Sequence, residues 1–403
     1  MFVVGCMLAC FFSGSIQAQT PDTTIHNKLP YRNYFNLREG IGNFYNTCKQ
    51  KHTATVAFLG GSITHNPGWR NKVCNWLTEH FPETKFRFIA AGIPSLGSLP
   101  HAFRLQRDVL DSGTIDLLFI EAAVNDRVNK TDSIIQVRSL EGIVRHAKST
   151  NPYMDIIMMS FADPYKTGDY DKGVTPVEIA NHEMIAAHYR LPSINLGKEV
   201  HDKMRNQEFD WVKDFKDIHP SPFGQELYYE NIKQLLLDAE EQFNKNNSSR
   251  HYRLPKPIDN GAFVNGNYRD VHKAVADANW TAQERWKPKD SAKTRNGFVN
   301  VPVLEATEPG ALLTLSFTGT AIGMAVVAGP DAGVIEYSID KGNWNKINLY
   351  TEWSSRLHLP WYVLFGSALK NKQHVLQLKI GNEQPAGSKG HACRVVHFLV
   401  NTN

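Results

Sequence analysis

Two short segments carry residue types that together perform nucleophilic catalysis. The segment GGSIT at residues 60–64 places Ser62 after paired glycines, at an expected strand-to-helix turn. Glycines allow such a turn to bend sharply, and free N–H groups beside it can stabilise a developing oxyanion. The segment DIHPS at residues 217–221 offers His219, and a serine hydroxyl needs an adjacent base of this kind. Taken singly, Ser62 fits a helix cap equally well, and most histidines are ordinary surface or core residues.

Two further positions follow expected strands. Asn125, in the segment AVND at residues 123–126, has a side-chain amide that can donate to an oxyanion. Gly92, in AAG at residues 90–92, can offer a backbone N–H at the same edge of the sheet. Each has a plainer interpretation as a turn residue.

Taken together, Ser62, Gly92, Asn125 and His219 form an ordered set, each at or beyond the carboxyl end of an expected strand. The set resembles the SGNH/GDSL hydrolase superfamily, with GGSIT for GDS(L), AAG for the glycine block, AVND for GxND and DIHPS for DxxHP. The resemblance covers about residues 53–240. It implies that Ser62 is the nucleophile and His219 the general base. It also implies an oxyanion hole of the Ser62 N–H, Gly92 and Asn125, with no metal and no organic cofactor.

Two positions depart from the family pattern. Gly61 stands where the GDS motif has aspartate, a replacement that divergent members of the group tolerate. The acid that orients the histidine normally lies three residues before it, where this chain has Lys216. Asp217 lies two residues before, a spacing similar to that of family-two carbohydrate acetyl esterases, in which a backbone carbonyl can orient the histidine. Asp217 is therefore the first candidate for the orienting group and Asp214 the second.

Alternating apolar and amphipathic segments must position these residues. Expected strands occupy 53–61, 86–92, 115–123, 154–162 and 191–196, and expected helices 68–80, 101–111, 133–149, 175–190 and 224–243. This alternation is typical of a parallel sheet covered by helices on both faces. The predicted fold class is α/β, and the resemblance implies a flavodoxin-like three-layer SGNH hydrolase domain at residues 30–245. Ligands of such sheets bind beyond the carboxyl ends of the strands.

The pattern changes after about residue 245. The polar segment NKNNSSRHYRLPKP suits a linker, and short alternating segments separated by Gly, Asn, Asp and Pro follow it. They predict an all-β, jelly-roll-like sandwich at residues 246–403. The segments are LLTLSFTG, AIGMAVVAG, GVIEYSID, HVLQLKIG and CRVVHFLV. Aromatic residues of this region favour a carbohydrate-binding role, although buried aromatics are the commoner use: Trp344, Tyr350, Trp353, Trp361 and Tyr362.

The N-terminal residues and the charge bear on location and partners. The apolar run within residues 1–18 and the small residues that follow it predict a secretory signal there, so we expect a secreted or periplasmic protein. A lipid anchor at Cys10 is less favoured because Phe11 and Phe12 follow it. The run is too short for a dependable membrane span. The formal net charge of +4, with no basic run, gives no reason to expect a nucleic-acid partner.

Three cysteines would remain after signal cleavage: Cys48, Cys74 and Cys393. They show no metal-ligand spacing, and they permit at most one disulfide, for which Cys48 and Cys74 are the more local pair. The alternative is that they are small buried hydrophobic residues.

Pairing an SGNH domain with a β-sandwich resembles polysaccharide-acting acetyl esterases of secreted bacterial systems. The leading expectation is therefore an esterase that removes acyl groups, O-acetyl first, from a polysaccharide or oligosaccharide. The alternatives are a lipase, thioesterase or methylesterase of the same fold, and an inactive glycan-binding protein.

Overall fold

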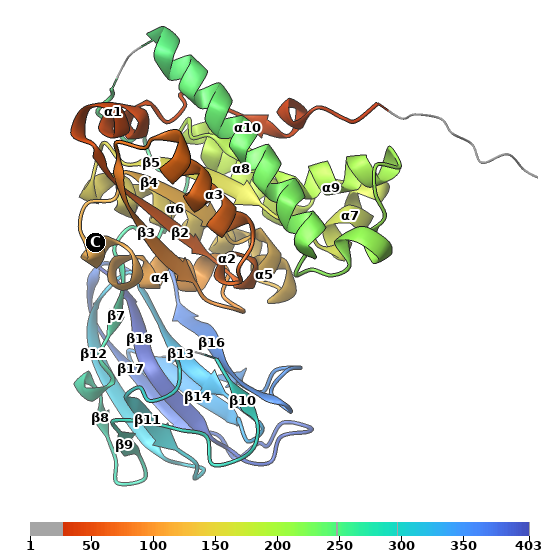
Figure 1. Cartoon of the computed structure of the whole chain (residues 1–403). Coiled ribbons are helices and arrows are strands. Elements are labelled where there is room, and N and C mark those ends of the chain that lie inside the picture. The colour runs from red at the N-terminus through yellow and green to blue at the C-terminus, as the bar shows by residue number, and fades with distance from the viewer. Residues whose placement is uncertain (1–26, 247–248, 296, 403) are drawn as a thin grey trace, which may run out of the picture.

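The computed structural model describes residues 27–246, 249–295 and 297–402. The expected signal at residues 1–18 lies outside the described residues. An α/β part comes first in the chain, and a part built of strands follows and packs beneath it (Figure 1). The described residues contain no helix that is both long and apolar enough to cross a bilayer.

The first part is built on a sheet with the strand order β1-β6-β5-β4-β2-β3. Strands β2 to β6 run parallel, and β1 joins antiparallel to β6. Numbered by their place in the chain, the parallel strands follow the flavodoxin order 2-1-3-4-5, so the expected α/β parallel sheet is present. The bounds are β1 Phe35–Asn36, β2 Thr53–Gly60, β3 Lys85–Gly92, β4 Leu117–Glu121, β5 Asp155–Ser160 and β6 Ser193–Asn195.

Helices cover both faces of this sheet because successive strand residues point to opposite sides. In β2, Val56 and Phe58 pack in one apolar cluster with α1, α3 and α10, whereas Ala57 and Leu59 pack in another with α4, α6 and α8. The helix bounds are α1 Gly42–Lys51, α2 Ser62–His65, α3 Trp69–His80, α4 Ser98–Asp108, α5 Ala123–Val128, α6 Ser133–Thr150, α7 Pro164–Asp171, α8 Val177–His188, α9 Leu196–Arg205 and α10 Pro222–Asn246.

The second part contains two sheets of mainly antiparallel strands, in agreement with the expected all-β fold. One has the order β10-β16-β13-β18-β11-β9 with β7 paired to β18, and the other β15-β14-β17-β12-β8. Their inner faces share one apolar cluster. The bounds are β7 Gly266–Arg269, β8 Val275–Ala276, β9 Thr281–Gln283, β10 Lys293–Thr294, β11 Val303–Ala306, β12 Leu312–Gly319, β13 Ala321–Ala328, β14 Val334–Ile339, β15 Asn345–Asn348, β16 Leu357–Gly366, β17 Lys372–Ile380 and β18 Cys393–Asn401.

The two parts share an apolar interface. Strand β13 is buried on both sides: Met324 points into the cluster between the two sheets, and Ala325 belongs to the cluster that also holds Phe103 of α4. Helix α4 therefore lies between the parallel sheet and the second part (Figure 1). The expected linker also packs closely, since the Tyr252 hydroxyl donates to buried Asp155 at 3.0 Å.

The described cysteines Cys48, Cys74 and Cys393 are all free. The optional Cys48–Cys74 bridge is therefore not formed. Cys48 and Cys393 are buried, as the alternative interpretation requires, whereas Cys74 is only partly buried.

Candidate active site

The nucleophile turn joins β2 to the short helix α2. Ser62 is the first residue of α2, and the His65 N–H donates to the Gly61 carbonyl at 3.0 Å to close the turn. A Cβ at Gly60 would lie 2.2 Å from the Thr64 hydroxyl oxygen, so a larger residue cannot occupy that position without displacing the turn. A glycine at position 60 is therefore a steric requirement of this tight connection between β2 and α2.

The structure brings Ser62 and His219 together across the sheet edge. His219 Nε2 lies 2.8 Å from Ser62 Oγ, a hydrogen-bond distance between residues 157 positions apart. His219 lies between the π-helical turn Trp211–Phe215 and α10. Its loop is closed by a hydrogen bond from the Ser221 N–H to the Phe215 carbonyl at 2.9 Å, which fixes the histidine above the serine.

The two candidate acids do not contact this histidine. The Asp217 carboxylate is exposed and accepts from the neighbouring Ile218 N–H, and the Asp214 carboxylate accepts from the Asp210 N–H at 2.8 Å. Lys216 has a φ of 77°, and the Asp217 N–H bonds to the Phe215 carbonyl across it. In the part of the chain that the structure describes, Nδ1 of His219 donates no hydrogen bond to a carboxylate or to a backbone carbonyl.

Gly92 ends β3 directly behind the nucleophile turn. A Cβ there would lie 2.5 Å from the backbone nitrogen of His65, and the Gly92 carbonyl accepts from His65 Nδ1 at 3.0 Å. Because the blocking atoms belong to the backbone, they cannot move aside as a flexible side chain would. Gly92 therefore lets β3 approach the nucleophile turn closely, and it also engages His65.

Asn125 lies in α5, beyond the end of β4, and is buried. A Cβ at Gly61 would lie 2.0 Å from Asn125 Oδ1, so the glycine that replaces the family's aspartate makes room for this side chain. Asp126 accepts from the Ser98 N–H and hydroxyl at 2.8 and 2.9 Å. Burial raises the pKa of Asp126 to about 7.

A cavity of about 410 Å³ opens above these residues. Ser62, Asn125 and His219 line it, and so do Trp353 and Leu357 of the second part, together with Arg295. Sequence reasoning alone did not indicate that the two parts share one cleft. Its volume is typical of a small-ligand site. In the described residues, no group of three or more His, Cys, Asp or Glu side chains is arranged to hold a metal ion.

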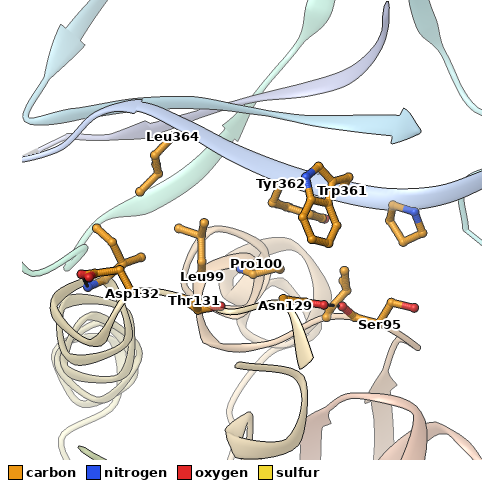
Figure 2. Close-up of a pocket in the computed structure, with 12 residues that line it drawn as sticks. Ser95, Leu99, Pro100, Asn129, Thr131, Asp132, Trp361, Tyr362 and Leu364 are labelled. Atoms are coloured by element: carbon orange, nitrogen blue, oxygen red, sulfur yellow. Dashed lines mark hydrogen bonds between the residues drawn. The ribbon is translucent and has the colours of Figure 1, made fainter. Parts of the chain in front are cut away.

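A smaller cavity of about 210 Å³ adjoins it and shares Ser95 and Asn129 with it. Figure 2 shows Trp361 and Tyr362 of β16 above Pro100 of α4 on the opposite wall. Of the five aromatic residues singled out in the sequence, Trp353 lines the larger cavity, and Trp361 and Tyr362 line the smaller. Trp344 and Tyr350 line neither.

One stretch of the chain is similar to a known family of enzymes. Residues 58–227 match the family model of GDSL-like lipases and acylhydrolases, and that stretch contains all four of the ordered residues. This part of the chain is therefore a GDSL-like acylhydrolase domain, and the protein is a carboxylic ester hydrolase.

The whole chain resembles a solved two-domain esterase that is active on acetylated mannans. In its crystal with mannopentaose the TM-score is 0.74 at 18% identity, and the alignment covers 94% of this chain and 99% of that one. A second crystal structure of such an esterase gives a TM-score of 0.73 at 18% identity, with 93% and 98% covered. This likeness establishes the two-domain fold. No curated protein matches the chain.

Proposed function

We propose that the protein is an exported esterase that removes O-acetyl groups from a polysaccharide or oligosaccharide. The observation that carries the proposal is the 2.8 Å contact between His219 Nε2 and Ser62 Oγ at the wall of a cavity shared by both parts. A hydroxyl, a base and an adjoining anion-stabilising corner are what acyl transfer requires.

In the proposed reaction Ser62 Oγ attacks the ester carbonyl while His219 Nε2 accepts the hydroxyl proton. The Ser62 N–H, the Gly92 N–H and the Asn125 amide form the oxyanion hole for the tetrahedral intermediate. Collapse of that intermediate releases the sugar alcohol, to which His219 returns the proton. Water then hydrolyses the acetyl-serine with His219 again acting as base. Asp217 is the nearest carboxylate to His219 in sequence, but its carboxylate accepts from the Ile218 N–H and does not contact the imidazole.

Support for a glycan comes from the second part. Trp353 lies in the cavity wall, and its ring centroid is 6.4 Å from that of Trp361, which lines the adjoining cavity. A sugar ring presents apolar C–H faces, which pack favourably on aromatic side chains. The resemblance to an esterase active on acetylated mannans makes such a mannan the first polymer to test. A polymeric substrate of this kind is consistent with the export we propose.

Acetate release from acetylated mannan and acetylated xylan, alongside a series of aryl esters of increasing acyl length, tests the proposal. We expect acetate release and a preference for acetyl over butyryl and octanoyl esters. A preference for long acyl chains would favour a lipase or thioesterase, and methanol release from a methyl-esterified glycan would favour a methylesterase. Glycan binding without hydrolysis of any ester would contradict the proposal and would favour an inactive glycan-binding protein.

Replacing Trp353 by alanine separates glycan recognition from chemistry. We expect KM for the acetylated polymer to rise by about five- to tenfold, because loss of one aromatic contact of this kind removes about 1–1.4 kcal/mol. For a small aryl acetate, kcat should stay within twofold. Trp344→Ala is the matched control, since its side chain is exposed and lines neither cavity. An equal loss of kcat on both substrates in Trp353→Ala would contradict a role confined to the glycan.

A further inference from the structure

Helix α4 carries two buried polar side chains that the proposed chemistry does not use. His101 and Arg104 are both 0% exposed, on a helix that packs between the parallel sheet and the second part. An arginine at such a depth is costly unless its donors and its charge are matched. The partners of these two side chains therefore indicate what they do.

Arg104 bonds to the ends of two strands at once. Its Nη2 donates to the Gly60 carbonyl at 3.2 Å and to the Ala91 carbonyl at 2.7 Å. Gly60 ends β2 and Ala91 is the penultimate residue of β3, so each carbonyl lies one or two residues before a proposed site residue. Its Nη1 donates to Asp108 at 2.9 Å, which balances the buried charge, and its Nε donates to His101 Nδ1 at 3.2 Å.

His101 extends the link to a third strand. Because a guanidinium can only donate, Nδ1 of His101 must be the acceptor, and Nε2 then carries the proton. That Nε2 lies 3.2 Å from the Glu121 carbonyl, at the end of β4 and before the turn to Asn125. Burial, and secondly the charge of Arg104, lower the pKa of His101 well below its ordinary value. The ring is therefore neutral, as this bonding pattern requires.

We infer that His101 and Arg104 are positioning residues that hold the carboxyl ends of β2, β3 and β4 at the mutual spacing needed by Ser62, Gly92 and Asn125. The two side chains are called the clasp below. The inference rests on the proposed function, because it assigns a role in assembling that site. It accounts for a buried charge and a buried imidazole, each of which needs polar partners at that depth.

Two features hold the clasp itself in place. At the start of α4, the Ser98 N–H and hydroxyl bond to Asp126, which directly follows Asn125. On the outer face, Phe103 packs in the cluster shared with the second part, where its ring centroid is 5.2 Å from that of Phe263. The helix is thus fixed against both the site and the sandwich, and its polar face has little freedom to shift.

Three substitutions of His101 separate the two links. His101→Asn can offer Oδ1 near the place of Nδ1 and keeps an acceptor for Arg104, while losing the bond to β4. His101→Gln can offer an N–H near the place of Nε2 and keeps the bond to β4, while losing the acceptor. His101→Leu loses both. We expect kcat on an aryl acetate to fall about tenfold for each single loss and about 10²-fold for leucine, with KM within twofold, because small misplacements of catalytic groups have effects of this size.

His146→Leu is the matched control. His146 lies on α6 and is also buried. Its Nε2 lies 3.0 Å from the side chain of Gln106, which is on α4. Within the described residues His146 makes no hydrogen bond to a strand end. It should lower Tm and leave kcat unchanged. Wild-type kcat in folded His101→Leu, or an equal loss of kcat in His146→Leu, would overturn the inference.

Hydrogen exchange gives a readout that does not depend on turnover. Peptides covering residues 58–66, 88–94 and 119–129 should exchange faster in His101→Leu than in His146→Leu at equal distance below Tm. If the wild type hydrolyses no ester, the proposed function fails and this comparison still decides the clasp. Unchanged exchange at the three strand ends would refute it.

Discussion

Ser62→Ala is expected to lower kcat for an aryl acetate by about 10⁴-fold or more, since removal of a serine nucleophile leaves only the oxyanion hole and binding. The hydroxyl that is lost is the one that lies 2.8 Å from His219 Nε2. The variant should keep its Tm to within a few degrees, because Ser62 makes no other side-chain hydrogen bond recorded in the described chain. Initial rates of acetate and aryl alcohol release measure the effect.

Labelling with a fluorophosphonate supplies the direct check on the same residue. Mass-spectrometric mapping should find the adduct on Ser62 in the wild type and no adduct on it in the alanine variant. Ser112→Ala is the control, since it removes a hydroxyl from a 3-10 turn, Leu110–Ser112, that lines neither cavity. Full activity in Ser62→Ala, or an adduct on another serine that tracks activity, would refute the nucleophile assignment.

His219→Ala is expected to reduce kcat by a similar factor, about 10⁴-fold or more, because the serine loses its general base. Fluorophosphonate labelling should slow in parallel, since phosphonylation needs the same deprotonation. KM for a small ester should change much less than kcat, because the imidazole contributes to proton transfer more than to ground-state binding.

Carboxamide variants of the two nearby acids show whether a carboxylate orients this histidine. Asp217→Asn and Asp214→Asn should each lower kcat less than about tenfold, because both carboxylates bond to backbone N–H groups and neither contacts His219. An orienting carboxylate would cost about 10⁴-fold on such a change. A loss of that size in either variant would mean that the loop rearranges during the reaction to bring the acid into contact.

Sequence patterns predicted the five parallel strands and the helices α3, α4, α6, α8 and α10 of the first part, because these segments are apolar and regular. Strand β1 and the ten-residue helices α1 and α9 were not predicted. Strand β2 and helix α3 occur where the pattern places them. The short helices α2 and α5 were not predicted, since four to six residues are too few to show a helical period. In the second part, β16 was missed because Pro360 interrupts its apolar run, and proline argues against a strand.

The candidate site likewise contains residues that the sequence indicated and contacts that only the folded structure reveals. The order of motif residues along the chain indicated Ser62, Gly92, Asn125 and His219. The contact between Gly61 and Asn125 could not be derived, because it depends on how closely two strands' loops approach. Trp353 in the wall of the cavity could not be derived either, since it depends on how one folded part lies against the other. His101 and Arg104 resembled ordinary residues of an amphipathic helix until their partners were known.

The double burial of β13 has a consequence for anyone who divides this molecule. Its odd-numbered residues would face water if the second part were expressed alone, and their partners on α4, such as Phe103, would face water if the first part were expressed alone. Newly exposing a large apolar side chain costs about 1.5–3 kcal/mol, so a few of them equal much of the 5–15 kcal/mol that holds a typical domain folded. Either part expressed alone would therefore be prone to aggregate and to unfold. A chimaera that exchanges one part would need an apolar surface on the new part that matches the part that is kept. The sandwich is thus a structural half of the enzyme and not a detachable module.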